Sequence, residues 1–298
     1  MIAVPAAFAE RTVARSGEAG RAWIESLPGR VGELCNLWNL EVESPAMHGE
    51  WGLVFAVRGT DSPAVLKVTW PDEDGSFHRA VTALSLWNGR GAVRLLRADM
   101  ERHALLLERL DSTATLGSVG VEEALRVAGS LLRRLAVPAP ADFPSLKTVV
   151  QRIEATLPER WERQGRPLPR QVVERARELA RHLAPSAGNL LVNWDIHDGN
   201  VLRAASEPWL VIDPQTLAGD VEYGLAQWLW WRLEEIEARA GVRWALDRLV
   251  ESAEVDAGRA FAWAYVRTVD YWLSGLETGL TIDPPRCERV IEGLGRVE

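Results

Sequence analysis

The residues best suited to chemistry lie in the stretch NWDIHDGNVLRAASEPWLVIDP, residues 193–214. Asp195, Asp198 and Asn200 fall within six positions between two apolar runs, and Asp213 follows Asn200 by thirteen residues. Carboxylate and amide oxygens are hard ligands, and Mg²⁺ that carries substrate phosphates is typically held by one or two such groups. A strand, a loop and a returning strand that present them therefore predict a site for magnesium and a phosphate-bearing substrate.

The order of these residues along the chain indicates which kind of magnesium site they form. Protein-kinase-type sites carry a catalytic Asp, then a metal-binding Asn, then a metal-binding Asp at the end of the next strand. Asp195, Asn200 and Asp213 have this order, after the apolar run NLLVNW and at the end of EPWLVIDP. The spacing from Asp195 to Asn200 also arises by chance, so its place between two strands carries the prediction. The alternative is a hairpin whose Asp and Asn side chains bond their own backbone.

A lysine in the N-terminal third offers a second element. Only two of the 34 basic residues are lysine, Lys67 and Lys147, so each stands out against an arginine background. Lys67 lies in the middle of the run AVLKVTW, where strand alternation places it on the face opposite its apolar neighbours. A compact ammonium suits contact with nucleotide phosphates. A solvated lysine on an edge strand is the alternative.

Length and composition bound the class of protein. The chain has 298 residues, 47% hydrophobic and 26% charged, which suits one large globular domain or two modest ones. The formal net charge of −8 argues against a nucleic-acid partner or an anionic membrane surface and favours a cationic ligand. The N-terminal segment lacks the pattern of a signal or a membrane span, so we expect a cytoplasmic protein. Two cysteines without metal-ligand spacing suggest neither a disulfide framework nor a zinc site.

The hydrophobic period divides the chain into two regions. The first is β-rich: a helix over 6–37, interrupted at Pro28 and Gly29, precedes a mixed sheet with one inserted helix that begins at Ser76. From about residue 113 the helical period dominates, with one hairpin that carries the acidic stretch. The segments expected to be regular are strands at 51–59 and 63–70, helices at 76–88, 121–136, 145–164 and 170–185, and a helical region from 222 to the end.

Over nearly its whole length the chain resembles the aminoglycoside phosphotransferase family, in its streptomycin phosphotransferase and hydroxyurea phosphotransferase branch. The similar segments are AVLKVTW, GRGAVRLL, ALLLERL, NWDIHDGNVL, EPWLVIDPQTLAGD and the helical tail. The resemblance implies an α+β, two-lobed protein-kinase-like fold with a small β-rich N-lobe and a larger, mainly helical C-lobe. Residues 1–110 would bind nucleotide, and residues 111–298 would carry catalysis and the acceptor site.

The resemblance also implies how a nucleotide binds. ATP would lie with Mg²⁺ in the cleft, its adenine near Glu108 to Leu110 and its phosphates near Lys67. The turn HGEWG, with Gly49 and Gly52, could cover the phosphates, although two glycines also make an ordinary turn.

In the same comparison, Asp195 would be the base that accepts the proton of the acceptor hydroxyl, and Asn200 and Asp213 would hold Mg²⁺. Asp220 matches a position with a structural role. His197 would either order the loop or contact phosphate.

Two features depart from the family pattern. Asn193 and Trp194 stand where His-Gly often precedes the catalytic Asp. Kinase-like enzymes also pair the strand lysine with a helix glutamate, whereas this chain has Arg79 or Ala80 there. Either a nearby acid replaces the missing glutamate or the chain binds nucleotide poorly, and the acids available before the helix are Asp72, Glu73 and Asp74.

The sequence therefore favours an ATP-dependent phosphotransferase that phosphorylates a hydroxyl of a small molecule. The acceptor class would be an aminoglycoside-type antibiotic such as streptomycin or a hydroxyurea-like compound, with Glu222, Asp270 and Glu277 as candidates to meet a polycation or as ordinary surface acids. The alternative is a kinase-like nucleotide-binding protein with weak or no catalysis. A metal-dependent hydrolase would leave Lys67 unexplained. The oligomeric state stays open.

Overall fold

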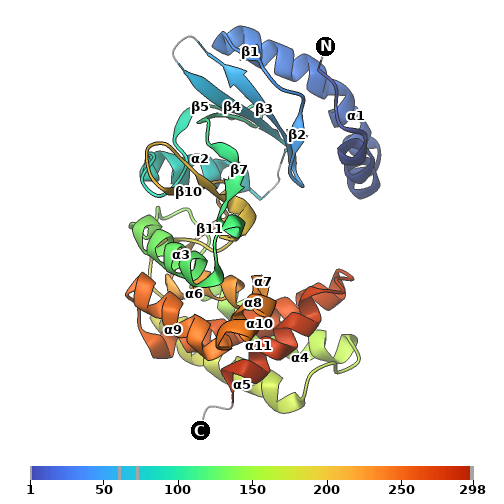
Figure 1. Cartoon of the computed structure of the whole chain (residues 1–298). Helices are drawn as coiled ribbons and strands as arrows, with labels where there is room; N and C mark the ends of the chain where they lie inside the picture. The colour runs from blue at the N-terminus through green and yellow to red at the C-terminus, as the bar shows by residue number, and fades with distance from the viewer. Residues whose placement is uncertain (1, 60–61, 72–73, 296–298) are drawn as a thin grey trace. The chain divides into compact units, whose positions relative to one another are not determined.

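The computed structural model describes residues 2–59, 62–71 and 74–295. The chain divides into two compact units, Met1–Leu110 and Asp111–Glu298 (Figure 1). No helix in the described part of the chain is both long enough and apolar enough to cross a membrane.

The first unit is built on a six-stranded sheet. Its strands are β1 (Glu41–Val42), β2 (Met47–His48), β3 (Gly52–Arg58), β4 (Pro63–Thr69), β5 (Leu95–Asp99) and β6 (Ala104–Glu108). They lie in the order β1-β3-β4-β6-β5, and β2 also pairs with β3. All these pairings are antiparallel, so the expectation of a mixed sheet is wrong. The connections β3–β4 and β5–β6 are short, and short connections can join only antiparallel neighbours.

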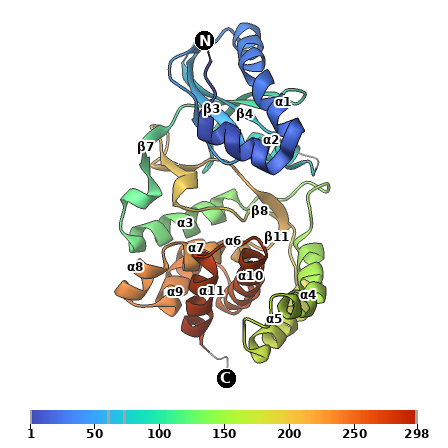
Figure 2. The ribbon, with the colours of Figure 1, turned by 90° about the vertical axis from the view of Figure 1, so that its right-hand side faces the viewer.

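Helix α1 (Ala6–Trp38) covers one face of this sheet, as Figure 2 shows. Its buried side chains, among them Trp23 and Leu27, form one core with Leu66 and Val68 of β4. Successive side chains of a strand point to opposite faces. Lys67 therefore lies on the face away from α1, between Val54 of β3 and Leu105 of β6.

Two helix boundaries differ from the prediction. Helix α1 continues through Pro28, because buried residues on both sides of it, such as Leu27 and Val31, pack against the sheet. The non-helical residue is instead Gly17, with φ 59° and ψ −131°, a conformation that glycine adopts without a steric penalty. Helix α2 (Ser76–Trp87) has Gly75 as its N-cap, not Ser76.

The second unit is mainly helical, in agreement with the hydrophobic period. Its helices are α3 (Val121–Leu135), α4 (Leu146–Arg163), α5 (Arg170–Leu183), α6 (Glu222–Leu225), α7 (Gln227–Trp231), α8 (Leu233–Arg239), α9 (Val242–Ala253), α10 (Ala257–Glu277) and α11 (Asp283–Leu294). Helix α10 is central: it contacts α5, α6, α9 and α11, and twelve of its residues are buried. Bulky side chains supply much of this core, including Trp228, Trp230 and Trp263.

In its described part, residues 111–295, the second unit also contains five short strands where the sequence indicated one hairpin. They are β7 (Asp111–Thr115), β8 (Leu190–Asn193), β9 (Val201–Arg203), β10 (Trp209–Val211) and β11 (Thr216–Gly219). Strands β10-β9-β7 form one sheet and β11-β8 another. The segment DSTAT has no apolar alternation, and it becomes a strand because it pairs with β9, a long-range contact that local propensity does not report. The acidic loop after β8 therefore links two different sheets.

Candidate active site

The β9–β10 hairpin brings Asn200 and Asp213 together. Val201 pairs with Val211, and the Ile212 N–H donates to the Asn200 carbonyl at 2.8 Å. Asn200 and Asp213 therefore stand at the same end of two hydrogen-bonded strands. This is the arrangement predicted for the two metal-binding residues.

Asp195 lies two residues beyond the end of β8 and is hydrogen-bonded to Asn200. Its carbonyl oxygen accepts from the Asn200 amide nitrogen at 3.2 Å, and its N–H donates to the Asn193 amide oxygen at 3.2 Å. One carboxylate oxygen, Oδ1, accepts from Gln227 Nε2 at 3.0 Å. The amide oxygen of Asn200 consequently faces away from the bond to Asp195, where a cation could use it.

His197 orders the acidic loop through contacts with Gly199 and Trp231. Its Nδ1 accepts from the Gly199 N–H at 3.1 Å, and its ring stacks on Trp231 with 4.3 Å between ring centroids. Burial lowers the pKa of His197, and the nearby charges of Asp195 and Asp213 oppose that shift. Both carboxylates thus act on one imidazole, and the bond to Gly199 favours the loop-ordering role over contact with phosphate.

Asp198 and Arg232 fix the other side of the loop. Arg232 is buried, and its Nη1 lies 3.8 Å from Asp198 Oδ1. The same guanidinium donates to Glu235 and to the Val119 carbonyl, the latter at 3.0 Å. Burial raises the pKa of Asp198, and the charge of Arg232 opposes that effect. These contacts attach the loop to the segment that follows β7.

The donor set suits a magnesium ion that is shared with a substrate. Within the described residues, no three His, Cys, Asp or Glu side chains gather as the ligands of a metal would. An all-protein cage is therefore not present there. Asn200 and Asp213 offer one amide oxygen and one carboxylate, and Mg²⁺ bound to nucleotide phosphates commonly takes only one or two carboxylates from the protein, with water and phosphate oxygens as the remaining ligands. The pair fits that requirement.

The glycine turn between β2 and β3 is held against α1. The Gly49 N–H donates to the Gly52 carbonyl at 3.1 Å, which closes the turn. A Cβ at Gly52 would come within 2.6 Å of the Val68 carbonyl, so only glycine fits there. The guanidinium of Arg15, on α1, lies 3.7 Å from the ring centroid of Trp51 in the turn. A role for Gly49 and Gly52 in covering phosphates stays a prediction.

The end of the first unit is also fixed by local contacts. The Glu108 N–H donates to the Arg94 carbonyl at 3.0 Å, and Glu108 Oε1 accepts from the Arg94 N–H at 2.7 Å. These bonds join the end of β6 to the segment before β5. They fix the position of Glu108, two residues before Leu110. The binding of adenine near Glu108 and Leu110 stays a prediction.

Helix α2 carries no acid that could pair with Lys67. Its sequence, SFHRAVTALSLW, contains neither Asp nor Glu. Of the three acids considered as substitutes, Asp72 and Glu73 lie outside the described residues. Asp74 forms an ion pair with Arg79 at 3.1 Å and accepts the Ser76 N–H at 3.0 Å. Asp74 therefore serves the start of α2.

The acids proposed for a cationic acceptor are already engaged or buried. Glu222 is only 8% exposed. Arg160 donates to Asp270 at 2.5 Å and to Glu277 at 3.1 Å. None of the three is a solvated carboxylate without a neighbour, so the structure does not favour them as the acceptor site.

Asp220 has a structural position. Its carboxylate accepts from the Gly188 N–H and from Trp263 Nε1, each at 2.8 Å, and it pairs with Arg259. These partners lie before β8 and on α10. Asp220 therefore attaches the end of β11 to the central helix.

Sequence reasoning missed two residues of the site, Gln227 and Arg267. Both are buried in helices rich in apolar side chains, in the stretches LAQWLWW and AYVRTVDYW. A buried polar group needs a partner, so a polar residue within such an apolar stretch was the signal that the sequence offered. Its partner could be known only from the tertiary structure.

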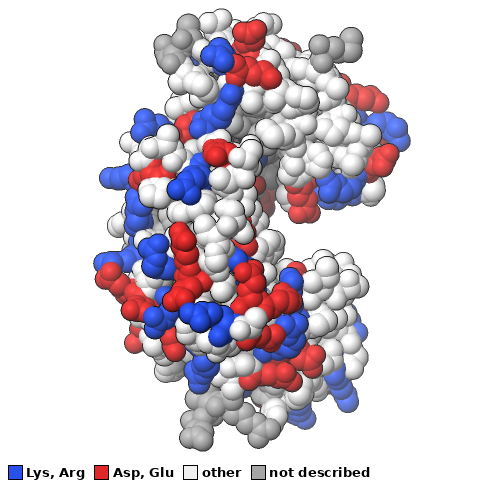
Figure 3. All heavy atoms as spheres, viewed as in Figure 1, with Lys and Arg blue, Asp and Glu red and all other residues white. Residues whose placement is uncertain are grey.

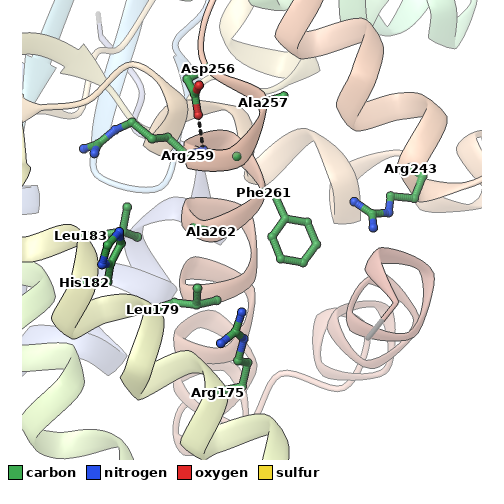
Figure 4. Close-up of a pocket in the computed structure, with 11 residues that line it drawn as sticks. Arg175, Leu179, His182, Leu183, Arg243, Asp256, Ala257, Arg259, Phe261 and Ala262 are labelled. Carbon is green, nitrogen blue, oxygen red and sulfur yellow. Dashed lines mark hydrogen bonds between the residues drawn. The ribbon is translucent and has the colours of Figure 1, made fainter. Parts of the chain in front are cut away.

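The cavity drawn in Figure 4 lies elsewhere in the second unit. It measures about 580 Å³, and α5, α9 and α10 line it with side chains such as Arg175, Arg243 and Phe261. The Asp256 carboxylate at its edge caps α10 by accepting the Arg259 N–H at 2.7 Å. None of the residues of the acidic loop lines this cavity.

An antiparallel sheet unit followed by a helical unit, with Asp, Asn and Asp in kinase order on strand ends, defines a phosphotransferase of protein-kinase-like fold. The chain belongs to the family of aminoglycoside/hydroxyurea antibiotic resistance kinases, whose model matches residues 37–276. The predicted family and fold class are thereby confirmed.

The similar proteins agree with this assignment. A streptomycin 6-kinase of Streptomyces griseus is 37% identical over 302 residues, which cover 99% of this chain and 98% of the relative. A hydroxyurea phosphotransferase of Kitasatospora aureofaciens is 37% identical over 300 residues, which cover 99% and 86%. An aminoglycoside phosphotransferase crystallised with ADP and hygromycin B has the same fold, with a TM-score of 0.61, 17% identity and coverage of 89% and 99%.

Proposed function

We propose that this phosphotransferase moves the terminal phosphoryl group of ATP, with Mg²⁺, to a hydroxyl of a small molecule in the cytoplasm. The acceptor is a streptomycin-type aminoglycoside or a hydroxyurea-like compound. The names of the two relatives, each with 37% identity over nearly the whole chain, support these two classes.

One observation carries the proposal. Asp195 is hydrogen-bonded to Asn200, and Asn200 stands beside Asp213 at the end of the β9–β10 hairpin. Phosphoryl transfer requires a base near the metal-binding residues, so the bond between Asn200 and the Asp195 backbone supports the proposal that Asp195 is that base. A hairpin with ordinary Asx turns would not need all three side chains at one end.

Each residue of the candidate site has its own role in the proposed reaction. Asp195 orients the acceptor hydroxyl and takes its proton as the oxygen attacks phosphorus. Asn200 and Asp213 would hold Mg²⁺, which when bound neutralises charge on the phosphate oxygens. Lys67 would contact the nucleotide phosphates, and the segment Glu108 to Leu110 the adenine. Catalysis then depends mainly on positioning and charge neutralisation.

A second function has one observation in its favour. Helix α2 lacks the acid that normally orients the strand lysine. A nucleotide-binding protein with weak or no catalysis would tolerate that loss. Such a protein would have no need of Asp195, which does not serve as a metal ligand in the proposed site.

Asp195→Asn tests the proposal. We expect turnover to fall about 100- to 10,000-fold, the usual contribution of a general base. ATP affinity, measured by calorimetry, should change little, because the base acts only as the reaction proceeds. The assay follows ADP release and the mass of the phosphorylated product with ATP, Mg²⁺ and either streptomycin or hydroxyurea.

Asp198→Asn is the matched control, since it makes the same change three residues further along the loop. Its turnover should stay within tenfold of the parent. Near-native turnover of Asp195→Asn would disprove the role of Asp195. ATP binding by the parent, without product from either acceptor, would instead favour the non-catalytic protein or another acceptor class.

A further inference from the structure

A buried amide, that of Gln227, donates a hydrogen bond to the Asp195 carboxylate. Gln227, on α7, is 7% exposed, and its Nε2 donates to Asp195 Oδ1 at 3.0 Å. Among the described residues, none donates a hydrogen bond to the other carboxylate oxygen, Oδ2. Oδ2 is therefore the oxygen available to an acceptor hydroxyl.

Arg267 determines which way the Gln227 amide faces. Its Nη2 donates to Gln227 Oε1 at 3.2 Å. A guanidinium carries only donors and an ionised carboxylate only acceptors. The amide oxygen must therefore face Arg267 and the amide nitrogen must face Asp195, since the reverse orientation would place two donors together and two acceptors together.

Arg267 is itself fixed on every side. It lies on α10, is 6% exposed, and donates to the carbonyls of Tyr223 at 2.9 Å and Trp194 at 2.5 Å. The rings of Tyr223, Trp194 and Trp230 surround its guanidinium, with centroids 4.9 to 5.6 Å away. Because Trp194 directly precedes Asp195, Arg267 holds both the backbone before the base and, through Gln227, the carboxylate.

We propose that Gln227 and Arg267 are positioning residues that hold Asp195 in one orientation, with Oδ2 directed at the acceptor hydroxyl. This inference rests on the proposed role of Asp195 as the base. A side chain that is fixed before the substrate arrives loses no further conformational freedom during the reaction. Correct placement of Asp195 matters because a small misplacement of a reacting group lowers the rate about 100-fold. The contribution should appear in kcat and not in KM, because neither residue contacts ATP or the acceptor.

Gln227→Glu and Gln227→Met test the inference. Glu keeps the shape of the side chain and the contact with Arg267 but cannot donate to Asp195 when ionised; Met keeps the length and removes both polar atoms. We expect kcat to fall about 10- to 100-fold in each. KM for ATP and for the acceptor should stay within threefold of the parent, and calorimetry should show unchanged ATP affinity.

Thr268→Val is the matched control for a buried polar residue next to Arg267. Its hydroxyl donates only to Ala264 within α10, so kcat should not change. A double variant, Asp195→Asn with Gln227→Met, should be no slower than Asp195→Asn alone, because Gln227 acts through Asp195. A purely structural role predicts further loss in the double variant.

The outcomes separate this inference from the proposed function. If Asp195→Asn keeps its turnover, the base assignment fails and the inference fails with it. If Asp195→Asn loses turnover while Gln227→Glu and Gln227→Met keep kcat within twofold, only the inference is overturned. A rise in KM without loss of kcat would mark Gln227 as a substrate contact and would also overturn it, as would failure of both Gln227 variants to fold.

Discussion

At the scale of single residues, Asp213 combines an unusual backbone with the proposed role of a metal ligand. Its φ of 53° lies in the left-handed region, which Asp and Asn tolerate better than other non-glycine residues. Asp213→Asn therefore removes the charge without straining the backbone. We expect the Mg²⁺ concentration for half-maximal rate to rise about tenfold or more, because outer partners of metal ligands already contribute that much. A magnesium titration of the steady-state rate measures it.

The exposed Asp247 on α9 provides the comparison for Asp213. Asp247→Asn makes the same chemical change away from the loop and should leave the magnesium titration unaltered. An Asp213→Asn enzyme with the parent's titration would contradict metal ligation by Asp213.

Glu222 gives a prediction about pH. Burial raises the pKa of Glu222 above its ordinary value of 4.5, and the Asp220 charge adds to the shift, while Arg259 opposes it. From pH 4.5 up to the raised pKa, the folded state holds a proton that the unfolded state has released, so stability falls as pH rises through that window. Glu222→Gln removes this effect. Its melting temperature at pH 7 should therefore exceed the parent's.

The difference in melting temperature between Glu222→Gln and the parent should become small at pH 4, where Glu222 is mostly protonated in both the folded and the unfolded state. Glu288→Gln, an exposed change on α11, should show no such pH-dependent gain. Equal melting temperatures of Glu222→Gln and the parent at both pH values would show that burial of this carboxyl has no net cost.

At the scale of elements, the sequence predicted those helices and strands that depend on a local pattern of apolar residues. The helices of the second unit follow a 3.6-residue apolar period, and the strand around Lys67 follows a period of two, so both were foreseeable. Strand β7 and the pairing of β8 with β11 were not, because they arise from contacts between segments far apart in the chain. A two-residue strand such as β1 carries no period at all.

The candidate site also has a part that the sequence predicts and a part that it does not. The order of Asp195, Asn200 and Asp213 could be predicted because all three lie within one short stretch of sequence. The residues that hold Asp195 could not, since Gln227 lies 32 residues and Arg267 lies 72 residues beyond Asp195 in the sequence. Only the packing of α7 and α10 against the loop shows which buried polar residues serve it.

Helix α2 yields a prediction about nucleotide binding. Ala80 lies one helical turn from the buried Phe77 and Leu84, on the packed side of the helix. Introducing an acid by Ala80→Glu should supply the carboxylate that α2 lacks and raise ATP affinity by about 0.5 to 1 kcal/mol, typical of a partly exposed ion pair. Calorimetric titration with ATP and Mg²⁺ measures the change.

The two lysines form a natural pair of controls for this experiment. Lys67→Ala should weaken ATP binding, whereas Lys147→Ala, an exposed change on α4, should not. If Lys67→Ala binds ATP as well as the parent, the proposed phosphate contact is wrong. If only Ala80→Glu has no effect, another acid already serves Lys67.

At the scale of the whole molecule, charge bears on the choice of acceptor. The formal net charge is −8. On the face shown in Figure 3, Asp and Glu side chains are interspersed with Lys and Arg. Many of the described acids and bases form ion pairs, for example Arg286 with Glu234. An acidic excess spread in this way acts on a charged ligand through the field of the whole protein, and salt screens that field.

The two proposed acceptors differ in charge, so ionic strength distinguishes them. Streptomycin carries guanidinium groups and should be attracted, whereas hydroxyurea is neutral. Between about 50 and 500 mM salt the Debye length falls about threefold, and we expect KM for a cationic acceptor to rise several-fold while kcat stays constant. Initial rates at saturating ATP and Mg²⁺ measure both constants, with hydroxyurea as the uncharged comparison under the same conditions. A KM for streptomycin that does not change with salt would mean that its recognition depends on contacts shielded from solvent and not on the charge of the protein.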